Sequence, residues 1–244
     1  MEPEPQIPEP FTKTYRLAMA VCRPVAWWGR LTVEGEEFVP RTGPMLIVGN
    51  HDSQMDPIVI GMAGIRRRQI RALAKSSLWD NPLLARVLKG MGQIPIERAM
   101  GDAGALVNAI DALRAGACIG IFPEGTISVG RELRARSGVG RLALEVPETR
   151  IVCAAVTGAP DIARFPKRPN LNVRFFEPAS GQTDPSETPT QIAERLVAEI
   201  RDVAPRVDAG RDPAKTLETY ERKAVKREQM ARERREAVPP GDTK

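Results

Sequence analysis

The sequence predicts an α/β fold in which a mostly parallel central sheet is flanked by helices. Between residues 31 and 176, short apolar runs alternate with segments of helical periodicity, as in strands joined by crossover helices. The apolar runs are nearly continuous, which is typical of strands buried on both faces. We expect strands at residues 45–48, 70–74, 93–96, 117–122, 151–156 and 171–176.

Two helices have the clearest periodicity. The first lies between the third and fourth strands, where Asp102 is the predicted N-cap and Gly116 the stop. Its apolar face consists of Leu106, Val107, Ile110 and Leu113. The second helix spans residues 191–203, after a stretch rich in proline, serine and threonine, and we expect it to close the core.

The chain of 244 residues suits one folded domain with an extension at each end. Residues 1–10 alternate proline with acidic residues and are predicted to be disordered. Residues 11–30 are predicted to form an amphipathic helix at a membrane interface, and residues 31–205 the α/β domain. Residues 206–244 form a charged tail that is helical or disordered, and contact of this basic tail with lipid or nucleic acid stays open.

The N-terminal amphipathic segment ends in adjacent tryptophans, and we expect an interruption near Pro24. Its polar side carries Lys13, Arg16 and Arg23. A helix of this kind can lie among lipid headgroups without crossing the bilayer. The alternative is a helix packed on the core of the domain.

Composition narrows the classes of function. A net charge of +5 favours an anionic partner, which can be nucleic acid, a phosphorylated small molecule or an anionic lipid surface. The single histidine excludes metal sites that need two imidazoles, and the three separated cysteines indicate neither a disulfide framework nor a zinc site. No run approaches the roughly 20 apolar residues of a membrane-spanning helix, and the first residues do not resemble a signal peptide, so we expect a cytoplasmic protein.

Polar residues follow three of the predicted strands. The sequence N-H-D-S-Q-M-D comes after residues 45–48, Glu97-Arg98 after 93–96, and P-E-G-T after 117–122. In an open α/β sheet, reactive groups gather beyond the carboxyl ends of the strands. These three loops therefore form the candidate site if their strands are neighbours.

His51 and Asp56 lie five residues apart, which in a continuous helix would place them about 140° from each other. Pro57 disfavours helical geometry at Asp56 and suits the first helical position, so a turn is expected between the two side chains. A carboxylate that accepts the Nδ1 hydrogen would leave Nε2 as a base for a hydroxyl proton. In the alternative interpretation, Asp56 only caps a helix and His51 is an exposed loop residue.

Three motifs in one order resemble a known family. N-H-D-S-Q-M-D, G-Q-I-P-I-E-R at residues 92–98 and F-P-E-G-T at residues 122–126 resemble the glycerolipid acyltransferases, and most closely the 1-acylglycerol-3-phosphate acyltransferases. The resemblance covers roughly residues 31–158 and implies that family's α/β fold, which makes residues 31–205 the acyltransferase domain.

The resemblance implies roles for individual residues. His51 resembles the family's general base, and Asp56 the carboxylate that orients it. Arg98 resembles the cation that receives the acceptor's phosphate, and Arg136, beside a glycine that opens a helix, resembles a second phosphate contact. The acceptor pocket would be lined by Glu124, Gly125 and Thr126. For Arg98 and Glu124 an ion pair that fixes the protein itself remains the alternative.

The chain departs from the family pattern in two places. Ile127 stands where many members have an arginine after E-G-T, so one phosphate contact is missing unless Arg98 with Arg136 or Arg131 replaces it. Cys153 lies in the segment 151–158, where the family's last motif usually has proline. The headgroup of the acceptor is therefore left open.

The implied reaction moves a fatty acyl chain from acyl-CoA or acyl carrier protein to the free hydroxyl of 1-acylglycerol 3-phosphate, giving phosphatidic acid. No cofactor and no metal are implied, since the thioester is a co-substrate, and the absence of G-x-S-x-G argues against a lipase-type hydrolase. The implied partners are a lysophospholipid acceptor, a thioester donor and an anionic membrane surface on the inner face of the cell membrane. Candidate membrane contacts are Trp27, Trp28 and the segment 66–79, whose arginines can also be solvated residues beside a buried strand.

Two alternatives remain at the level of sequence. The first is an acyltransferase for glycerol 3-phosphate or another lysolipid. The second is a non-catalytic protein that binds lipid or nucleic acid through its basic surface. Nucleic acid is not favoured as a partner, because aromatic residues make up 5% of the chain and are not interleaved with basic residues on a strand.

Overall fold

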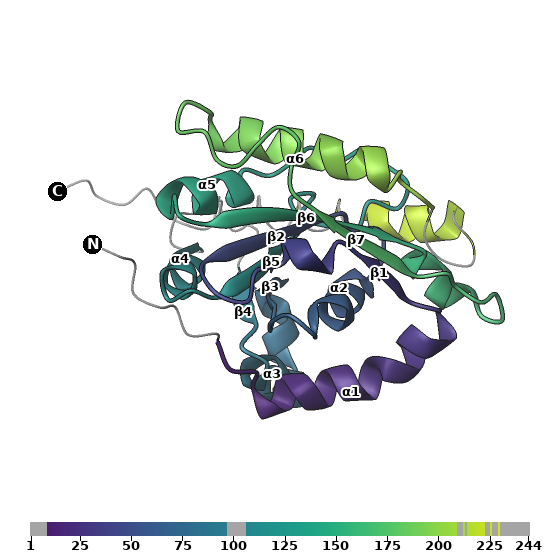
Figure 1. Ribbon diagram of the computed structural model, residues 1–244. Helices are drawn as coiled ribbons and strands as arrows, with labels where there is room; N and C mark the ends of the chain where they lie inside the picture. Colours follow the sequence, from purple (N-terminus) through teal and green to yellow (C-terminus); the bar gives the residue numbers. More distant parts are fainter. Residues whose placement is uncertain are drawn as a thin grey trace, which may run out of the picture.

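The computed structural model describes residues 9–96, 106–208, 212, 214–222, 225 and 229, which form one seven-stranded sheet with helices on both faces (Figure 1). The order of the strands is β1-β7-β6-β2-β5-β3-β4. Their bounds are Thr32–Glu34 for β1, Met45–Gly49 for β2, Arg71–Lys75 for β3, Ile94–Ile96 for β4, Cys118–Ile121 for β5, Arg150–Thr157 for β6 and Asn172–Phe176 for β7. The predicted α/β class and all six predicted strands are confirmed.

The sheet is mostly parallel, as predicted. Strands β6, β2, β5, β3 and β4 run in one direction, whereas β7 pairs antiparallel with β6 and parallel with β1. Strand β1 was not predicted from the sequence, because it has three residues, lies at the edge of the sheet and is largely exposed. A short polar edge strand lacks the apolar run that identifies the central strands.

The helices numbered in the described part of the chain are α1 Lys13–Trp28, α2 Asp56–Gly64, α3 Pro82–Gly90, α4 Val107–Arg114, α5 Gly138–Glu145 and α6 Pro189–Val203. Short 3-10 turns occur at η1 Glu36–Phe38, η2 Ser76–Asp80 and η4 Ala159–Arg164. Figure 1 shows α5 and α6 above the sheet and α2 with α1 below it. The domain is therefore layered, with α1 as an outer layer over α2.

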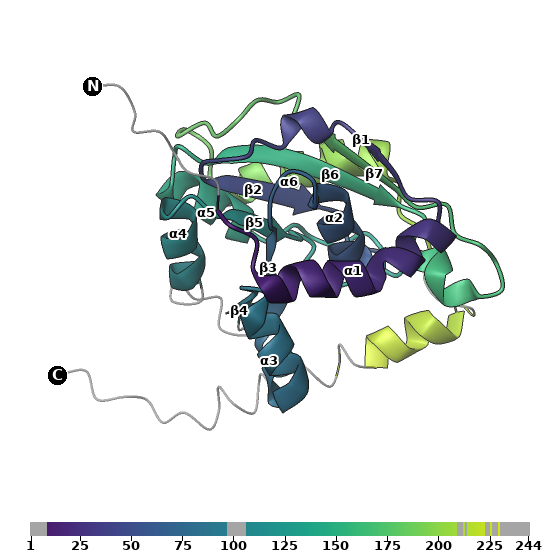
Figure 2. The same ribbon diagram turned by 60° about the horizontal axis from the view of Figure 1, so that its bottom comes forward.

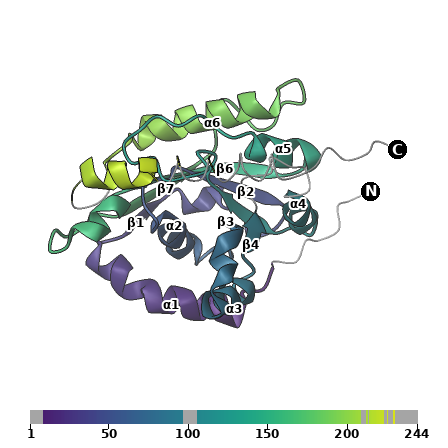
Figure 3. The ribbon, with the colours of Figure 1, turned by 180° about the vertical axis from the view of Figure 1, so that it is seen from behind.

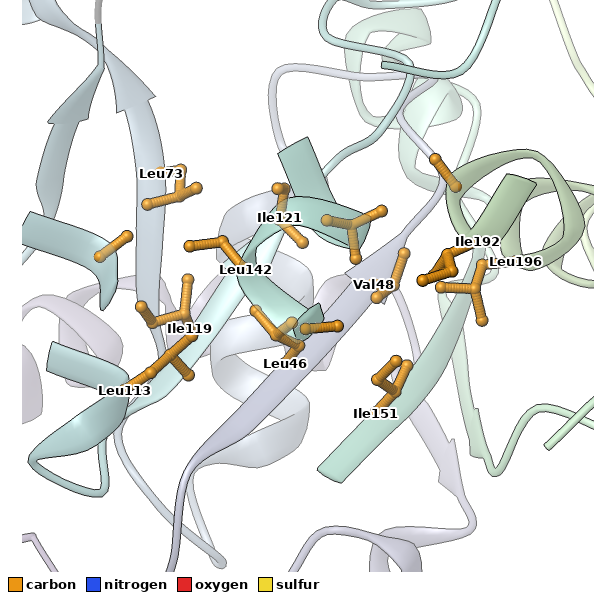
Figure 4. Packing of buried hydrophobic residues seen from close by; sticks show 14 of the residues in the cluster. Leu46, Val48, Leu73, Leu113, Ile119, Ile121, Leu142, Ile151, Ile192 and Leu196 are labelled. Carbon is orange, nitrogen blue, oxygen red and sulfur yellow. The ribbon is translucent and has the colours of Figure 1, made fainter. Parts of the chain in front are cut away.

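The two faces of the sheet carry separate apolar clusters. Along β2, Leu46 and Val48 point to the cluster under α4, α5 and α6, which Figure 4 shows. Met45 and Ile47 point to the other cluster, under α1 and α2. Because successive strand residues face opposite sides, all four side chains are buried, and β2 lies at the centre of the domain.

Helix α1 runs through Pro24, so the predicted interruption there was wrong. Proline removes one hydrogen bond to the carbonyl of the residue four positions earlier, which is Ala20. Both Pro24 and Ala20 are exposed to solvent, where an unpaired carbonyl costs little. The inner face of α1 packs on α2 through Tyr15 and Met19, which are 1% and 6% exposed.

The predicted C-terminal ends of α4 and α6 agree with the structure. Helix α4 ends at Arg114 and the chain leaves it through Gly116, whose φ of +81° suits glycine. Its start differs from the prediction, because α4 begins at Val107 with Leu106 as its N-cap, and Asp102 lies outside the described residues. Helix α6 starts at a capping box between Thr188 and Gln191.

At the N-terminal end of the described chain, Glu9 accepts a hydrogen bond from Nε of Arg71 at 3.0 Å.

No helix in the described part of the chain has the length and apolar character that crossing a membrane requires. In the tail, residues 214–222 are helical (yellow in Figure 3).

Candidate active site

The loops after β2 and β5 meet because these strands are hydrogen-bonded neighbours, with Val48 opposite Ile121. The first loop carries His51 and the second carries Glu124. Asn50 ties the first loop to β6 on the other side, since its side chain accepts from the Val156 amide at 2.7 Å and donates to the Val156 carbonyl at 2.9 Å. The predicted convergence of these two loops is confirmed.

The turn between His51 and Asp56 places the two side chains in contact, with Nδ1 of His51 3.1 Å from Oδ2 of Asp56. Helix α2 begins at Asp56, and Pro57 occupies its first turn. The same Oδ2 accepts the backbone N–H groups of Asp52 and Ser53, each at 2.7 Å. The carboxylate therefore fixes the turn before α2 and orients the imidazole, whereas the N-cap of α2 is Met55 and has no side-chain capping bond.

Burial raises the pKa of Asp56, whereas the hydrogen bonds from His51 and from the Ser53 amide oppose the shift. Asp56 is 1% exposed, and its Oδ1 has no hydrogen-bond partner among the described residues. All of its donors converge on Oδ2, so the carboxylate is fixed in one orientation toward Nδ1. Nε2 is then the nitrogen available to a substrate.

The imidazole of His51 stacks on the ring of Phe122, with centroids 4.5 Å apart and planes 25° apart. His51 is 9% exposed, so it is nearly buried rather than an exposed loop residue. Phe122 also lines a cavity of about 570 Å³. His51 itself does not line this cavity, so Phe122 connects the imidazole to a space large enough for a ligand.

The lining of this cavity combines apolar and cationic side chains. Its apolar wall includes Leu73, Ile96, Ile121 and Leu133. Glu124, Gly125, Thr126 and Arg136 line it as well, together with Arg134 and Arg141. An apolar wall with three guanidinium groups suits a ligand that has both a hydrocarbon part and an anionic part.

Gly125 and Arg136 lie in direct contact. The φ angle of Gly125 is +69°, and a Cβ atom there would lie 2.4 Å from Nε of Arg136. Helix α5 begins at Gly138, two residues after Arg136, in agreement with the sequence prediction. Glycine is required at residue 125 by both the backbone conformation and the close approach of the arginine.

The carboxylate of Glu124 points toward the protein and not toward the solvent side of the cavity. Its side chain is 1% exposed and accepts from Arg201 of α6, with Nε of Arg201 3.0 Å from Oε1. Oε2 also accepts the backbone N–H of His51 at 3.0 Å. The ion pair that sequence analysis kept as the alternative to a substrate contact is therefore present in the structure.

Arg201 is a site residue that sequence reasoning missed. It binds Asp52 as well as Glu124 and is 7% exposed. A signal was present, because Arg201 continues the helical row of Ala193 and Val197, where an apolar residue is expected. A cation on the apolar face of a helix indicates a buried acidic partner.

Ile127 serves a packing role in place of the family's arginine. It is 7% exposed and packs with Val129, Leu217 and Tyr220. The helical segment 214–222 thereby contacts the loop that follows the E-G-T sequence, and the Tyr220 hydroxyl lies 3.5 Å from Nε2 of Gln54.

Several arginines that the sequence suggested as phosphate or membrane contacts are bound elsewhere in the protein or are not described. Arg98 lies outside the described residues. Arg131 is half-buried and donates to the Ser128 carbonyl at 3.3 Å. In the segment 66–79, Arg67 donates to the Val39 carbonyl at 2.8 Å, and Arg68, which is 2% exposed, donates to the Gly43 carbonyl at 2.9 Å. Arg67 and Arg68 therefore hold loops together, whereas the side chain of Arg66 is 82% exposed, as the alternative of solvated arginines expected.

The buried cysteines are unsuited to nucleophilic chemistry. Burial raises the pKa of Cys118 and of Cys153 to about 12, which keeps both thiols protonated near neutral pH. Cys153 packs in the cluster under α6, on strand β6. Within the described residues, no group of three or more His, Cys, Asp or Glu side chains is arranged to hold a metal ion.

Comparisons with known proteins show the family of this chain. The family model described as Acyltransferase matches residues 30–159, which include His51, Asp56 and Glu124. The 1-acyl-sn-glycerol-3-phosphate acyltransferase of Borreliella burgdorferi is 35% identical over 135 residues, covering 53% of each chain. The enzyme of the same name from Bacillus subtilis is 28% identical over 154 residues, covering 63% of this chain and 66% of that protein.

The chain thus spans between about half and two thirds of the length of these curated relatives. The crystal structure of the 1-acyl-sn-glycerophosphate (LPA) acyltransferase PlsC from Thermotoga maritima has a similar fold, with a TM-score of 0.55 and 20% identity over 79% of this chain and 83% of that chain. Because the family model matches more than half of this chain, the chain belongs to the acyltransferase family.

Proposed function

We propose that the protein transfers a fatty acyl chain from a thioester to the free hydroxyl of 1-acylglycerol 3-phosphate. The observation that carries this proposal is the contact of 3.1 Å between His51 and Asp56 at the carboxyl end of β2, where the imidazole stacks on Phe122 of the cavity wall. The two curated relatives named as acyltransferases for this acceptor support the choice of substrate.

In the proposed mechanism, Nε2 of His51 accepts the proton of the acceptor hydroxyl. The oxygen then attacks the thioester carbonyl, a C–O bond forms, and the C–S bond breaks to release the thiolate. The imidazolium returns its proton to the thiolate, so the histidine is regenerated and no covalent acyl-enzyme forms. Asp56 stabilises the imidazolium through Nδ1.

The cavity suits the two parts of the proposed acceptor. Its apolar wall would take hydrocarbon, and Arg134, Arg136 and Arg141 would face the phosphate. Arg98, which the family resemblance implies as a phosphate contact, would add to these cations. Glu124 would support the acceptor pocket from beneath, through Arg201, while Gly125 and Thr126 line it.

The test is transfer of a radiolabelled acyl chain from acyl-CoA and from acyl carrier protein to lysophosphatidate in liposomes. Lysophosphatidylcholine and glycerol 3-phosphate serve as competing acceptors, each at the same concentration. We expect phosphatidic acid as the main product, with kcat/KM for lysophosphatidate at least about tenfold above that for lysophosphatidylcholine. The phosphate monoester has one more anionic oxygen than the phosphodiester, and a hydrogen bond to a charged group contributes on the order of 1.5–3 kcal/mol.

Transfer to another acceptor would move the proposal to that lysolipid. No transfer with either donor, together with salt-sensitive binding to DNA, would replace it with the non-catalytic alternative.

We further propose that the protein docks on the inner face of the cell membrane through α1 and α3. Leu17, Val21 and Trp27 on the outer face of α1 are 66%, 70% and 79% exposed. Leu83, Leu84 and Val87 on α3 are also exposed, and exposed lysines and arginines interrupt both sets. The two helices touch and share one side of the domain (Figure 2). Exposed apolar residues among cations favour an anionic lipid surface.

Replacing Trp27 or Leu83 with serine should weaken binding to anionic vesicles by about tenfold each, because each change removes an apolar side chain worth on the order of 1.5–3 kcal/mol. Co-sedimentation with phosphatidylglycerol vesicles measures the effect. Val203→Ser is the matched control, since Val203 is a 37% exposed apolar residue on α6, over the opposite face of the sheet. Equal losses in all three variants would contradict docking through α1 and α3.

A further inference from the structure

We propose that Arg201 on α6 is a positioning residue for acyl transfer, which fixes the loop that carries His51 and balances the negative charge of the carboxylates around the imidazole. The inference rests on the proposed role of His51 as the base. Arg201 lies beyond residues 30–159, the part of the chain that the family model matches. The residue is therefore a contribution of α6 to a site whose other parts come from the strand-end loops.

The guanidinium of Arg201 is fully engaged. Nη1 donates to Oδ2 of Asp52 at 2.7 Å and Nη2 donates to Oδ1 at 3.0 Å, so this pair is bidentate. On its other side, Nε and Nη2 donate to Oε1 of Glu124 at 3.0 and 2.6 Å. Nη1 also reaches the Ala204 carbonyl at 3.3 Å. Only a planar fork of donors can bind two carboxylates in this way, and lysine cannot replace it.

Both carboxylates transmit this constraint to His51. Glu124 accepts the His51 backbone N–H at 3.0 Å, and Asp52 is the next residue in the chain. Ser128 donates its backbone N–H to the His51 carbonyl at 2.8 Å and its hydroxyl to Oδ1 of Asp52. The backbone of His51 is thus held at its N–H by Glu124 and at its carbonyl by Ser128. Arg201 binds Glu124 directly and is linked to Ser128 through Asp52.

The charges around the imidazole come from each element packed against it. Asp56 starts α2, Asp52 lies in the loop after β2, Glu124 follows β5, and Arg201 comes from α6. Arg131, at the Ser128 carbonyl, is the next cation along the loop. Asp56 is matched by the imidazolium that forms during the reaction. Arg201 is the cation that compensates Asp52 and Glu124.

Arg201 stays charged in this position. Burial alone would lower its pKa, but the hydrogen bonds to Asp52 and Glu124 outweigh burial and the net shift is upward. Without the guanidinium, two buried carboxylates would favour a protonated imidazole before the substrate arrives. A protonated His51 cannot accept the hydroxyl proton, so the loss should appear in the pH dependence of the reaction and not only in stability.

The experiment compares Arg201→Gln and Arg201→Lys with Arg195→Gln, all in the full chain. Arg195 is the matched control, because it lies on the same helix and binds Glu187 at 2.7 Å and the Gln182 carbonyl at 2.6 Å, away from His51. Two readouts are used: kcat/KM against pH, and the NMR titration of the imidazole. His51 is the single histidine of the chain, so its resonance is identified without assignment of the whole protein.

We expect Arg201→Gln to lower kcat by about 100-fold and to move both the acidic limb of the profile and the imidazole titration to higher pH. Arg201→Lys keeps the charge but loses the fork, so it should lower kcat while moving the titration less. Arg195→Gln should leave the titration and the shape of the profile unchanged, even where it lowers Tm.

An unmoved titration in a folded Arg201→Gln protein would overturn the proposal. If that variant does not fold, Arg201→Lys decides, and native kcat in the lysine variant would overturn the positioning role. The imidazole titration does not require turnover. Absence of acyl transfer by the native protein would therefore refute the proposed function, whereas the titration tests Arg201 separately.

Discussion

Replacing His51 with alanine is expected to lower kcat for acyl transfer by about 1,000-fold, within the range of 10²–10⁴ that general base catalysis contributes. The hydroxyl of the acceptor is a poor nucleophile until its proton is removed, and His51 is the histidine that can remove it. Because the proposed role of the imidazole toward the acceptor is limited to the reacting hydroxyl, KM for the acceptor should change little. Initial rates of acyl transfer at saturating donor measure both constants.

Asp56→Asn is the matched variant for the pair. Asparagine keeps an oxygen for the backbone N–H groups of Asp52 and Ser53 but removes the charge that stabilises the imidazolium, so kcat should fall by about 100-fold with little loss of helix α2. Circular dichroism serves as the control for folding. If the rate of His51→Ala lies within tenfold of the native rate, His51 is excluded as the general base. Native kcat in Asp56→Asn would limit the role of Asp56 to holding the turn through the backbone N–H groups of Asp52 and Ser53.

The sheet was predictable from the sequence because its central strands are buried on both faces. Such strands, including β2 and β6, are continuous apolar runs that need no tertiary information to recognise. The edge strand β1 and the passage of α1 through Pro24 depend on neighbours and on exposure to solvent, which the sequence does not encode locally. Local propensity yields to tertiary context in both cases.

The candidate site was only partly predictable, for a related reason. The loops that carry His51 and Glu124 follow strands, and the rule that parallel strands expose their carboxyl ends together brings them to one place. Arg201 is separated from Asp52 by 149 residues, and only the packing of α6 on the sheet reveals the contact. The packing of Ile127 could not be predicted either, since its partners Leu217 and Tyr220 lie in the tail.

Replacing Glu124 with alanine is expected to destabilise the folded protein by about 3–5 kcal/mol, the cost of breaking one side of a buried ion pair. The change leaves Nε of Arg201 and the backbone N–H of His51 without the acceptor they share. Since the side chain is 1% exposed, water cannot easily replace the carboxylate. The free energy of unfolding from urea denaturation measures the loss.

Glu132→Ala is the control, because Glu132 is 87% exposed and lies 3.9 Å from Arg206, a surface pair that contributes less than about 1 kcal/mol. Glu124→Gln separates stability from recognition. Its amide keeps the size of the side chain but turns an N–H group toward Arg201, so stability should fall while KM for the acceptor stays near the native value. A glutamine variant of native stability with a raised KM would instead mean that the carboxylate binds the acceptor. In that case the ion pair with Arg201 would have to open when the substrate enters.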